Sequence, residues 1–210
     1  MQIRILQIGI GLVLTLGAGS LPWPVWDNEF ADNAHLLGNE LIYWGLVVAT
    51  IVYVRRIERR PLASIGLRRP SLVDGLIGVV FALATIAGLA ALYFVIFPFF
   101  GLSEAEQLDK LAAAPSWWLA ISVVRAGVSE EVLFRGYPIE RLQELSGSRL
   151  LAFGLPLAVF TLAHVGPWGW THLIVAGFGG AMLTGLYVWR HNLWVSIFAH
   201  CLIDGAAMLS

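Results

Sequence analysis

Long apolar stretches separated by short polar segments run through the whole chain, and this pattern restricts it to a fold built in a membrane. Hydrophobic residues make up 58% of the 210 residues and charged residues only 13%, with a mean hydropathy of +0.77. A soluble globular domain carries about 25% charged residues. The pattern therefore predicts an all-α fold, a polytopic transmembrane helical bundle.

Seven stretches approach the roughly 20 apolar residues that one transmembrane helix needs. We expect about seven spans, at residues 4–21, 37–54, 73–99, 116–139, 150–166, 171–189 and 193–209. No internal repeat or soluble insertion interrupts them, so residues 1–210 are predicted to form a single integral membrane domain. Arg4, an apolar run and Ala18-Gly19-Ser20 also resemble a cleavable signal peptide, but we expect the first span to be retained.

The distribution of charge predicts an orientation. The segment from Arg55 to Arg69 holds six of the 13 basic residues, and the positive-inside rule places it in the cytoplasm. Alternation then puts the N-terminus in the cytoplasm and the C-terminus outside. The net charge of −1, without a basic arm, predicts no nucleic-acid partner. We expect a bacterial plasma-membrane protein whose partner is the lipid bilayer; its oligomeric state stays open.

Several residues near these spans are predicted to be structural. The lone Cys201 cannot form an intramolecular disulfide, and we expect it to be a small core residue. Trp118 and Trp168, near predicted outer ends, are expected in the aromatic belt at the membrane surface. Three of the five histidines lie near predicted loops or span ends, and we assign them no role: His35, His172 and His191.

Six ionisable side chains inside the predicted spans form three short groups. They are Glu130, Glu131 and Arg135, then His164, then His200 and Asp204. A charged side chain facing lipid at the bilayer centre costs about 2.5–3.5 kcal/mol. These groups are therefore expected to face one another or water, which marks a site by default.

The spacing of these groups indicates acid–base chemistry. Glu131 and Arg135 lie at i,i+4 on one helix face, which leaves Glu130 without an obvious partner and suited to act as a general base. His200 and Asp204 have the same spacing, so the carboxylate could orient the imidazole. Together the groups could activate water and stabilise an oxyanion. A purely structural ion pair and a proton pathway are the alternatives, although a transporter would often show internal repeats.

Three motifs, Glu130-Glu131-x-x-x-Arg135, Phe160-x-x-x-His164 and His200-x-x-x-Asp204, resemble those of the CPBP family of intramembrane proteases. This family, also called Abi, includes the type II CAAX prenyl endopeptidases. The similarity covers a motif core at about residues 116–206. It implies an intramembrane endopeptidase whose partner is a membrane-associated protein or peptide substrate; the alternative is a non-catalytic bacteriocin-immunity or scaffold protein of the same family.

The resemblance also implies a role for each motif residue. Glu130 would activate the attacking water and His164 would help to hold it, whereas Glu131 and Arg135 would support the site. His200 and residue 204 would stabilise the oxyanion. Relatives often have asparagine at the last position, so Asp204 is either protonated, or orients His200, or helps to bind a metal. Zinc is possible as a cofactor, with His164 and His200 as ligands, but we expect no obligatory metal.

Overall fold

The structure is a computed structural model that describes residues 2–21 and 33–208, with side chains from residue 36 in the second part. Every regular element in this part of the chain is helical, as the composition predicts, and the described residues contain no strand. The predicted all-α bundle is therefore confirmed. His35 lies outside the described side chains.

Seven helical segments follow one another, several of them continued by a π-helical or short helical turn. Their bounds are α1 Gln2–Leu12 with η1 Val13–Gly17, α2 Asn33–Val52 with η2 Tyr53–Ile57, α3 Leu72–Ala91 with η4 Leu92–Ile96 and α4 Phe97–Phe100, α6 Ser116–Glu130 with η5 Glu131–Gly136 and α7 Tyr137–Ser146, α8 Arg149–Ala163 with α9 Val165–Trp168, α10 His172–Arg190, and α11 Leu193–Met208. Two shorter elements lie in the connections: η3 Leu62–Ile65 and α5 Ala105–Ala112.

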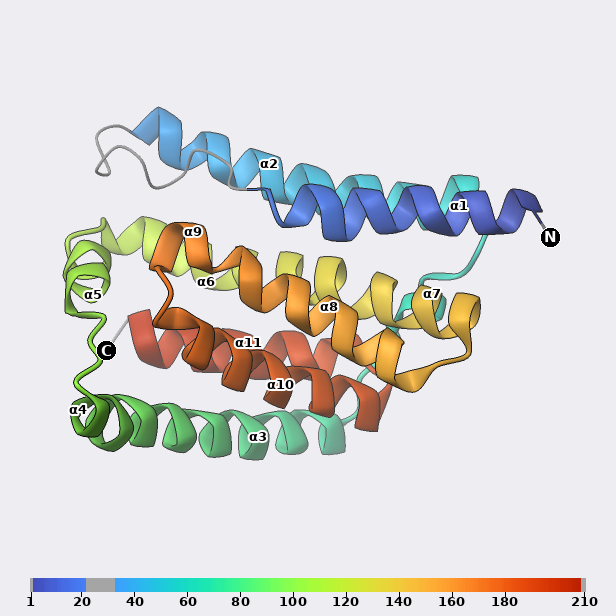
Figure 1. Cartoon of the computed structure of the whole chain (residues 1–210). Coiled ribbons are helices and arrows are strands. Elements are labelled where there is room, and N and C mark those ends of the chain that lie inside the picture. Colours follow the sequence, from blue (N-terminus) through green and yellow to red (C-terminus); the bar gives the residue numbers. More distant parts are fainter. Residues whose placement is uncertain (1, 22–32, 209–210) are drawn as a thin grey trace.

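The segments run side by side as an elongated bundle (Figure 1). Helix α11 lies between α3 and α6, and α8 packs against α7 and α10, whereas α1 and α2 cover the α6–α7 side. The segment linking α2 to α3 and the turns after α7 and α10 lie at one end, and the α4–α5 and α9–α10 connections lie at the other. Apolar side chains face outward along the segments, for example Leu76 at 68% and Phe94 at 81% exposed, as expected for a surface that meets lipid.

The predicted number of spans is not confirmed. Four helical segments are long and apolar enough to cross a membrane, namely 36–57, 72–100, 149–168 and 172–190, and a fifth exists if α5 and the 116–146 helix, bent by 115°, count as one span. The described parts of the first and last segments are shorter apolar helices. Helix α11, with 16 residues, rises only about 24 Å, less than the roughly 30 Å of a bilayer core. The chain is a multi-pass membrane protein.

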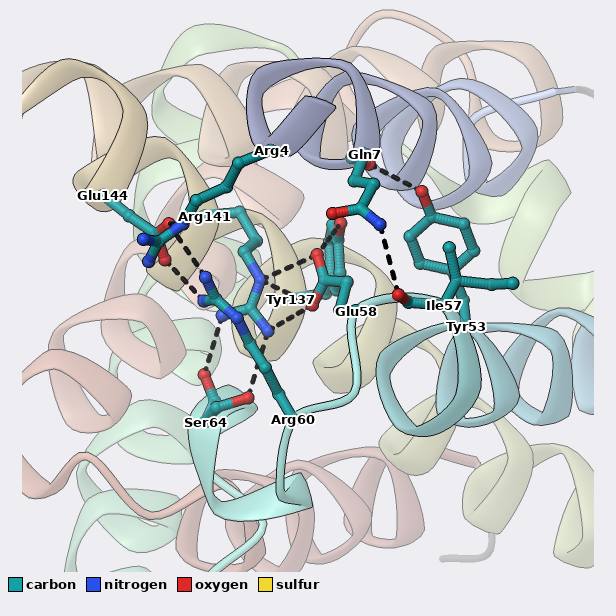
Figure 2. A network of polar contacts seen from close by, with 10 residues as sticks. All are labelled: Arg4, Gln7, Tyr53, Ile57, Glu58, Arg60, Ser64, Tyr137, Arg141 and Glu144. Carbon is teal, nitrogen blue, oxygen red and sulfur yellow. Dashed lines mark hydrogen bonds and ion pairs between the residues drawn. The ribbon is translucent and has the colours of Figure 1, made fainter. Parts of the chain in front are cut away.

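A network of ion pairs fastens the segment after α2 to α7 (Figure 2). The buried Arg141 guanidinium contacts Glu58 at 2.6 Å and donates to the Ser64 hydroxyl and carbonyl oxygens. Nearby, Glu144 accepts hydrogen bonds from Arg60 and Arg4. The bond from Arg60 is the main reason that the pKa of Glu144 falls to about 2. Part of the basic segment thus anchors one end of the helix that carries Glu130.

Candidate active site

The first motif group lies where α6 continues into the π-helical segment η5. Glu130 is the last residue of α6 and Glu131 the first of η5. The predicted contact between Glu131 and Arg135 is present, with Arg135 Nη1 3.0 Å from Glu131 Oε1 and both side chains buried. The Arg135 guanidinium also lies over the Phe160 ring, 4.0 Å from its centroid. This buried pair supports the site from within the protein. It lies in a π-helical turn, and such turns occur frequently at functional sites.

His200 of α11 joins this pair through its Nδ1 atom. Nδ1 lies 3.0 Å from Glu131 Oε1, the same oxygen that accepts from Arg135. Since an ionised carboxylate only accepts hydrogen bonds, Nδ1 carries a proton. The sequence left open whether Asp204 orients the imidazole. In the structure Glu131 accepts the hydrogen bond from Nδ1. Glu131, and not Asp204, therefore orients the ring through that atom.

The other nitrogen of His200 faces two carboxylates. Nε2 lies 3.4 Å from Asp204 Oδ2 and 3.8 Å from Glu130 Oε2. Glu130, which we expected to lack a partner, therefore has a histidine beside it. The Glu130 and Asp204 side chains are each 19% exposed, whereas Glu131 is fully buried. The two adjacent glutamates consequently differ in environment: one is a buried support and the other is accessible.

A glycine allows α6 and α11 to approach closely enough for these contacts. A Cβ atom at Gly127 would collide with the Cys201 sulfur and would lie 3.4 Å from the Ile197 carbonyl oxygen. Cys201, which is half-buried and a free thiol, packs at this crossing, in agreement with its predicted structural role. The small residue at position 127 thus brings Glu130 and His200 together.

His164 enters the site from the junction between α8 and α9. Its Nδ1 lies 2.7 Å from the Phe160 carbonyl oxygen, which can only accept, so Nδ1 carries the proton. In the neutral ring Nε2 is then a hydrogen-bond acceptor. The Phe160 ring packs against one side of the imidazole, with centroids 4.5 Å apart, and the spacing of the second motif therefore serves to orient this histidine.

All three groups meet at one cavity of about 470 Å³. Glu130, His164, His200 and Asp204 line it, whereas Glu131 and Arg135 lie behind its wall. The lining is largely apolar and aromatic and includes Phe134, with the ionisable groups gathered among these side chains. The cavity has room for water, which a hydrolytic reaction within a helical bundle requires.

Sequence reasoning missed other residues that line the cavity. Arg125, inside a predicted span, is bonded through Nε to Glu40 at 3.0 Å; its charge was an available signal that we did not use. His172, to which we assigned no role, also faces the cavity. Trp118 is only 2% exposed and Trp168 stacks on His172. Both tryptophans line the cavity, so the belt prediction is wrong for them.

The described residues do not fit a catalytic metal site. A catalytic zinc needs three protein ligands, and no group of three or more histidine, cysteine, aspartate or glutamate side chains within residues 2–21 and 33–208 is arranged to hold a metal ion. Each nitrogen of His200 already has a carboxylate beside it.

Comparison with protein families shows a match over residues 112–206 to the type II CAAX prenyl endopeptidase Rce1-like family. The match agrees with the resemblance that the three motifs predict, over this region of the chain. The matched Rce1-like region begins shortly before α6 and includes all three motif groups. No curated protein and no solved structure matches the chain.

Proposed function

We propose that this protein is an intramembrane endopeptidase that hydrolyses a peptide bond of a membrane-associated protein or peptide. The observation that carries the proposal is the meeting of Glu130, His164 and His200 at one cavity within the Rce1-like region. Glu130 is an accessible carboxylate, which suits it to act as a general base in hydrolysis. The neighbouring His200 is oriented by the buried Glu131.

In the proposed reaction, a water molecule lies between Glu130 and His164. One O–H of this water donates to the Glu130 carboxylate and the other to Nε2 of His164. As the water oxygen bonds to the carbonyl carbon of the peptide, Glu130 takes the proton. The C–N bond then breaks, and Glu130 returns the proton to the leaving amine. The carboxylate is regenerated, and the net reaction consumes one water molecule.

His200 is proposed to stabilise the oxyanion that forms on the peptide carbonyl. Its Nδ1–H is directed at Glu131, so donation from Nε2 into the cavity requires the doubly protonated imidazolium. The Asp204 and Glu130 carboxylates beside Nε2 would stabilise this form. A donor directed at a developing oxyanion contributes about 10²–10³ in kcat. Asp204 lies beside the same nitrogen, and in protonated form it would be a second donor. Its position therefore favours a direct role in the cavity over a role in orienting the ring.

The test is a comparison of protein termini in host membranes that contain either the wild-type protein or Glu130→Gln at matched expression. Glu140→Gln is the matched control, because Glu140 lies in α7 and contacts Tyr187 but does not line the cavity. We expect a defined set of new termini with the wild-type protein and the control, and none with Glu130→Gln. The lost termini would also identify the substrate class.

Two results would overturn the proposal. The first is identical sets of termini for all three proteins, which would favour a binding or immunity role without catalysis. The second is cleavage that continues in Glu130→Gln, which would show that another group activates the water.

A further inference from the structure

A second carboxylate–histidine pair lies at the end of the cavity near α5. His172, the first residue of α10, has its Nδ1 3.1 Å from both carboxylate oxygens of Glu104. The Tyr93 hydroxyl donates to the same carboxylate at 2.6 Å. Burial opposes ionisation of Glu104, but the hydrogen bonds from His172 and Tyr93 outweigh it and hold the pKa of Glu104 below its usual value.

The contact with Glu104 fixes the His172 ring, which stacks on the ring of His164. The rings of His172 and His164 are stacked, with centroids 5.7 Å apart and an interplanar angle of 20°. Trp168 also stacks on His172, with ring centroids 4.7 Å apart. The Phe160 ring also packs against His164, with centroids 4.5 Å apart and an interplanar angle of 55°, so two rings neighbour the imidazole of His164.

These ring contacts, together with the bond to the Phe160 carbonyl, fix the orientation of the His164 ring. Rotation of its ring by 180° would exchange the positions of nitrogen and carbon atoms and would lose the bond to the Phe160 carbonyl. Packing against the Phe160 and His172 rings restricts other motion of the His164 ring. The free nitrogen, Nε2, is therefore kept in one position next to the cavity that Glu130 also lines.

We propose that His172, held by the Glu104 carboxylate to which Tyr93 also donates, is a positioning residue that keeps His164 oriented toward the reacting water. The part of this inference that concerns water rests on the proposed function, whereas the part that concerns the orientation of His164 does not. His172 acts through His164 and through its stacked ring. A planar ring at position 172 is consequently the property that the site needs, and the bond to Glu104 keeps that ring in place.

The first test measures the tautomer of His164 directly, by ¹⁵N NMR of histidine-labelled protein in nanodiscs, with the signal assigned by its loss in His164→Gln. The wild-type protein should show a single tautomer with the proton on Nδ1. His172→Asn, which removes the ring, should give a mixture of tautomers, and His172→Phe, which keeps a ring, should not. If His172→Asn does not fold, His172→Leu replaces it. An unchanged His164 signal in the ring-free variant would overturn the proposal.

The second test measures cleavage kinetics on a substrate identified from the lost termini. His191→Asn is the matched control, because His191 also lies near a carboxylate, Glu140, at 3.6 Å but is absent from the cavity wall. We expect kcat to fall about tenfold to a hundredfold in His172→Asn, since a displacement of 1 Å in a reacting group costs about 10²-fold. KM should stay unchanged, and His172→Phe should recover most of the loss.

The two tests separate the inference from the function on which it partly rests. Equal kcat values in His172→Asn and His172→Phe, or an effect on KM alone, would show that His172 only joins α10 to Glu104. If no cleavage is found with the wild-type protein but the tautomers change as expected, the proposed function fails and the positioning of His164 stands.

Discussion

The buried pair of Glu131 and Arg135 allows a quantitative prediction about stability. Its charged atoms lie 3.0 Å apart, with side chains 0% and 1% exposed. At an effective dielectric constant of about 20, two unit charges at this distance attract each other by about 5–6 kcal/mol. Removal of one partner leaves the other charge buried without compensation, which costs about 3–5 kcal/mol.

We therefore predict that Glu131→Gln and Arg135→Met each lower the free energy of unfolding by about 3–5 kcal/mol. Arg135→Met should cost about 1 kcal/mol more, because it also removes the cation–π contact with Phe160. The double variant buries neither charge, so its loss should not exceed that of the worse single variant. The measurement is reversible unfolding in mixed detergent micelles, followed by circular dichroism.

The control is the pair of Glu106 and Lys110, which has the same i,i+4 spacing but exposed side chains. Its double-mutant cycle should show no measurable coupling, whereas the buried pair should show at least about 2 kcal/mol. Losses at the buried pair that add to within about 0.5 kcal/mol would refute the reasoning, because they would show that the two charges do not compensate each other.

Further predictions concern the cavity, the ion-pair network and the helix crossing. Asp204→Asn should keep cleavage near the wild-type rate, because its amide donates to an oxyanion, whereas Asp204→Ala should lower kcat about tenfold or more; equal losses in the two variants would contradict a hydrogen-bonding role. The contacts with Arg60 and Arg4 lower the pKa of Glu144 from 4.5 to about 2. These contacts therefore stabilise the fold above about pH 4.5, and this stabilisation is lost as the pH falls toward about 2. Glu144→Gln should remove that part of the acid-unfolding slope, and an unchanged slope would show that the ion pair is not formed in solution. Gly127→Ala should destabilise the fold by about 1–3 kcal/mol and reduce cleavage, because a Cβ atom there meets Cys201. Gly185→Ala in α10, where a Cβ atom has open space, should not destabilise the protein; equal effects at the two glycines would contradict the close crossing.

Much of the fold could be predicted because hydropathy and local spacing are properties of neighbouring residues. The seven helical segments lie close to the predicted stretches, and the contact of Glu131 with Arg135 follows from the helical repeat. Segment length was harder to predict. The described part of α11 is shorter than a full span, and α5 forms an amphipathic helix where we expected only a connection.

The parts of the site that the sequence did not reveal depend on residues far apart in the chain. Glu131 and His200 are separated by 69 positions, and Glu104 and His172 by 68. Neither pair has a spacing that one helix could impose. Whether Glu131 or Asp204 orients His200 depends on how α6 crosses α11, and that crossing depends on Gly127.

By itself the sequence determined that the chain crosses a membrane, which residues are candidates for the site and which family the motifs resemble, because apolar length, charge and local spacing are properties of consecutive residues. The tertiary structure alone decided that Glu131 supports His200, that Arg125 and His172 reach the cavity, and that Trp118 and Trp168 lie in its wall instead of a belt at the membrane surface. The physical reason is that packing between helices, and not position along the chain, sets which side chains share a cavity.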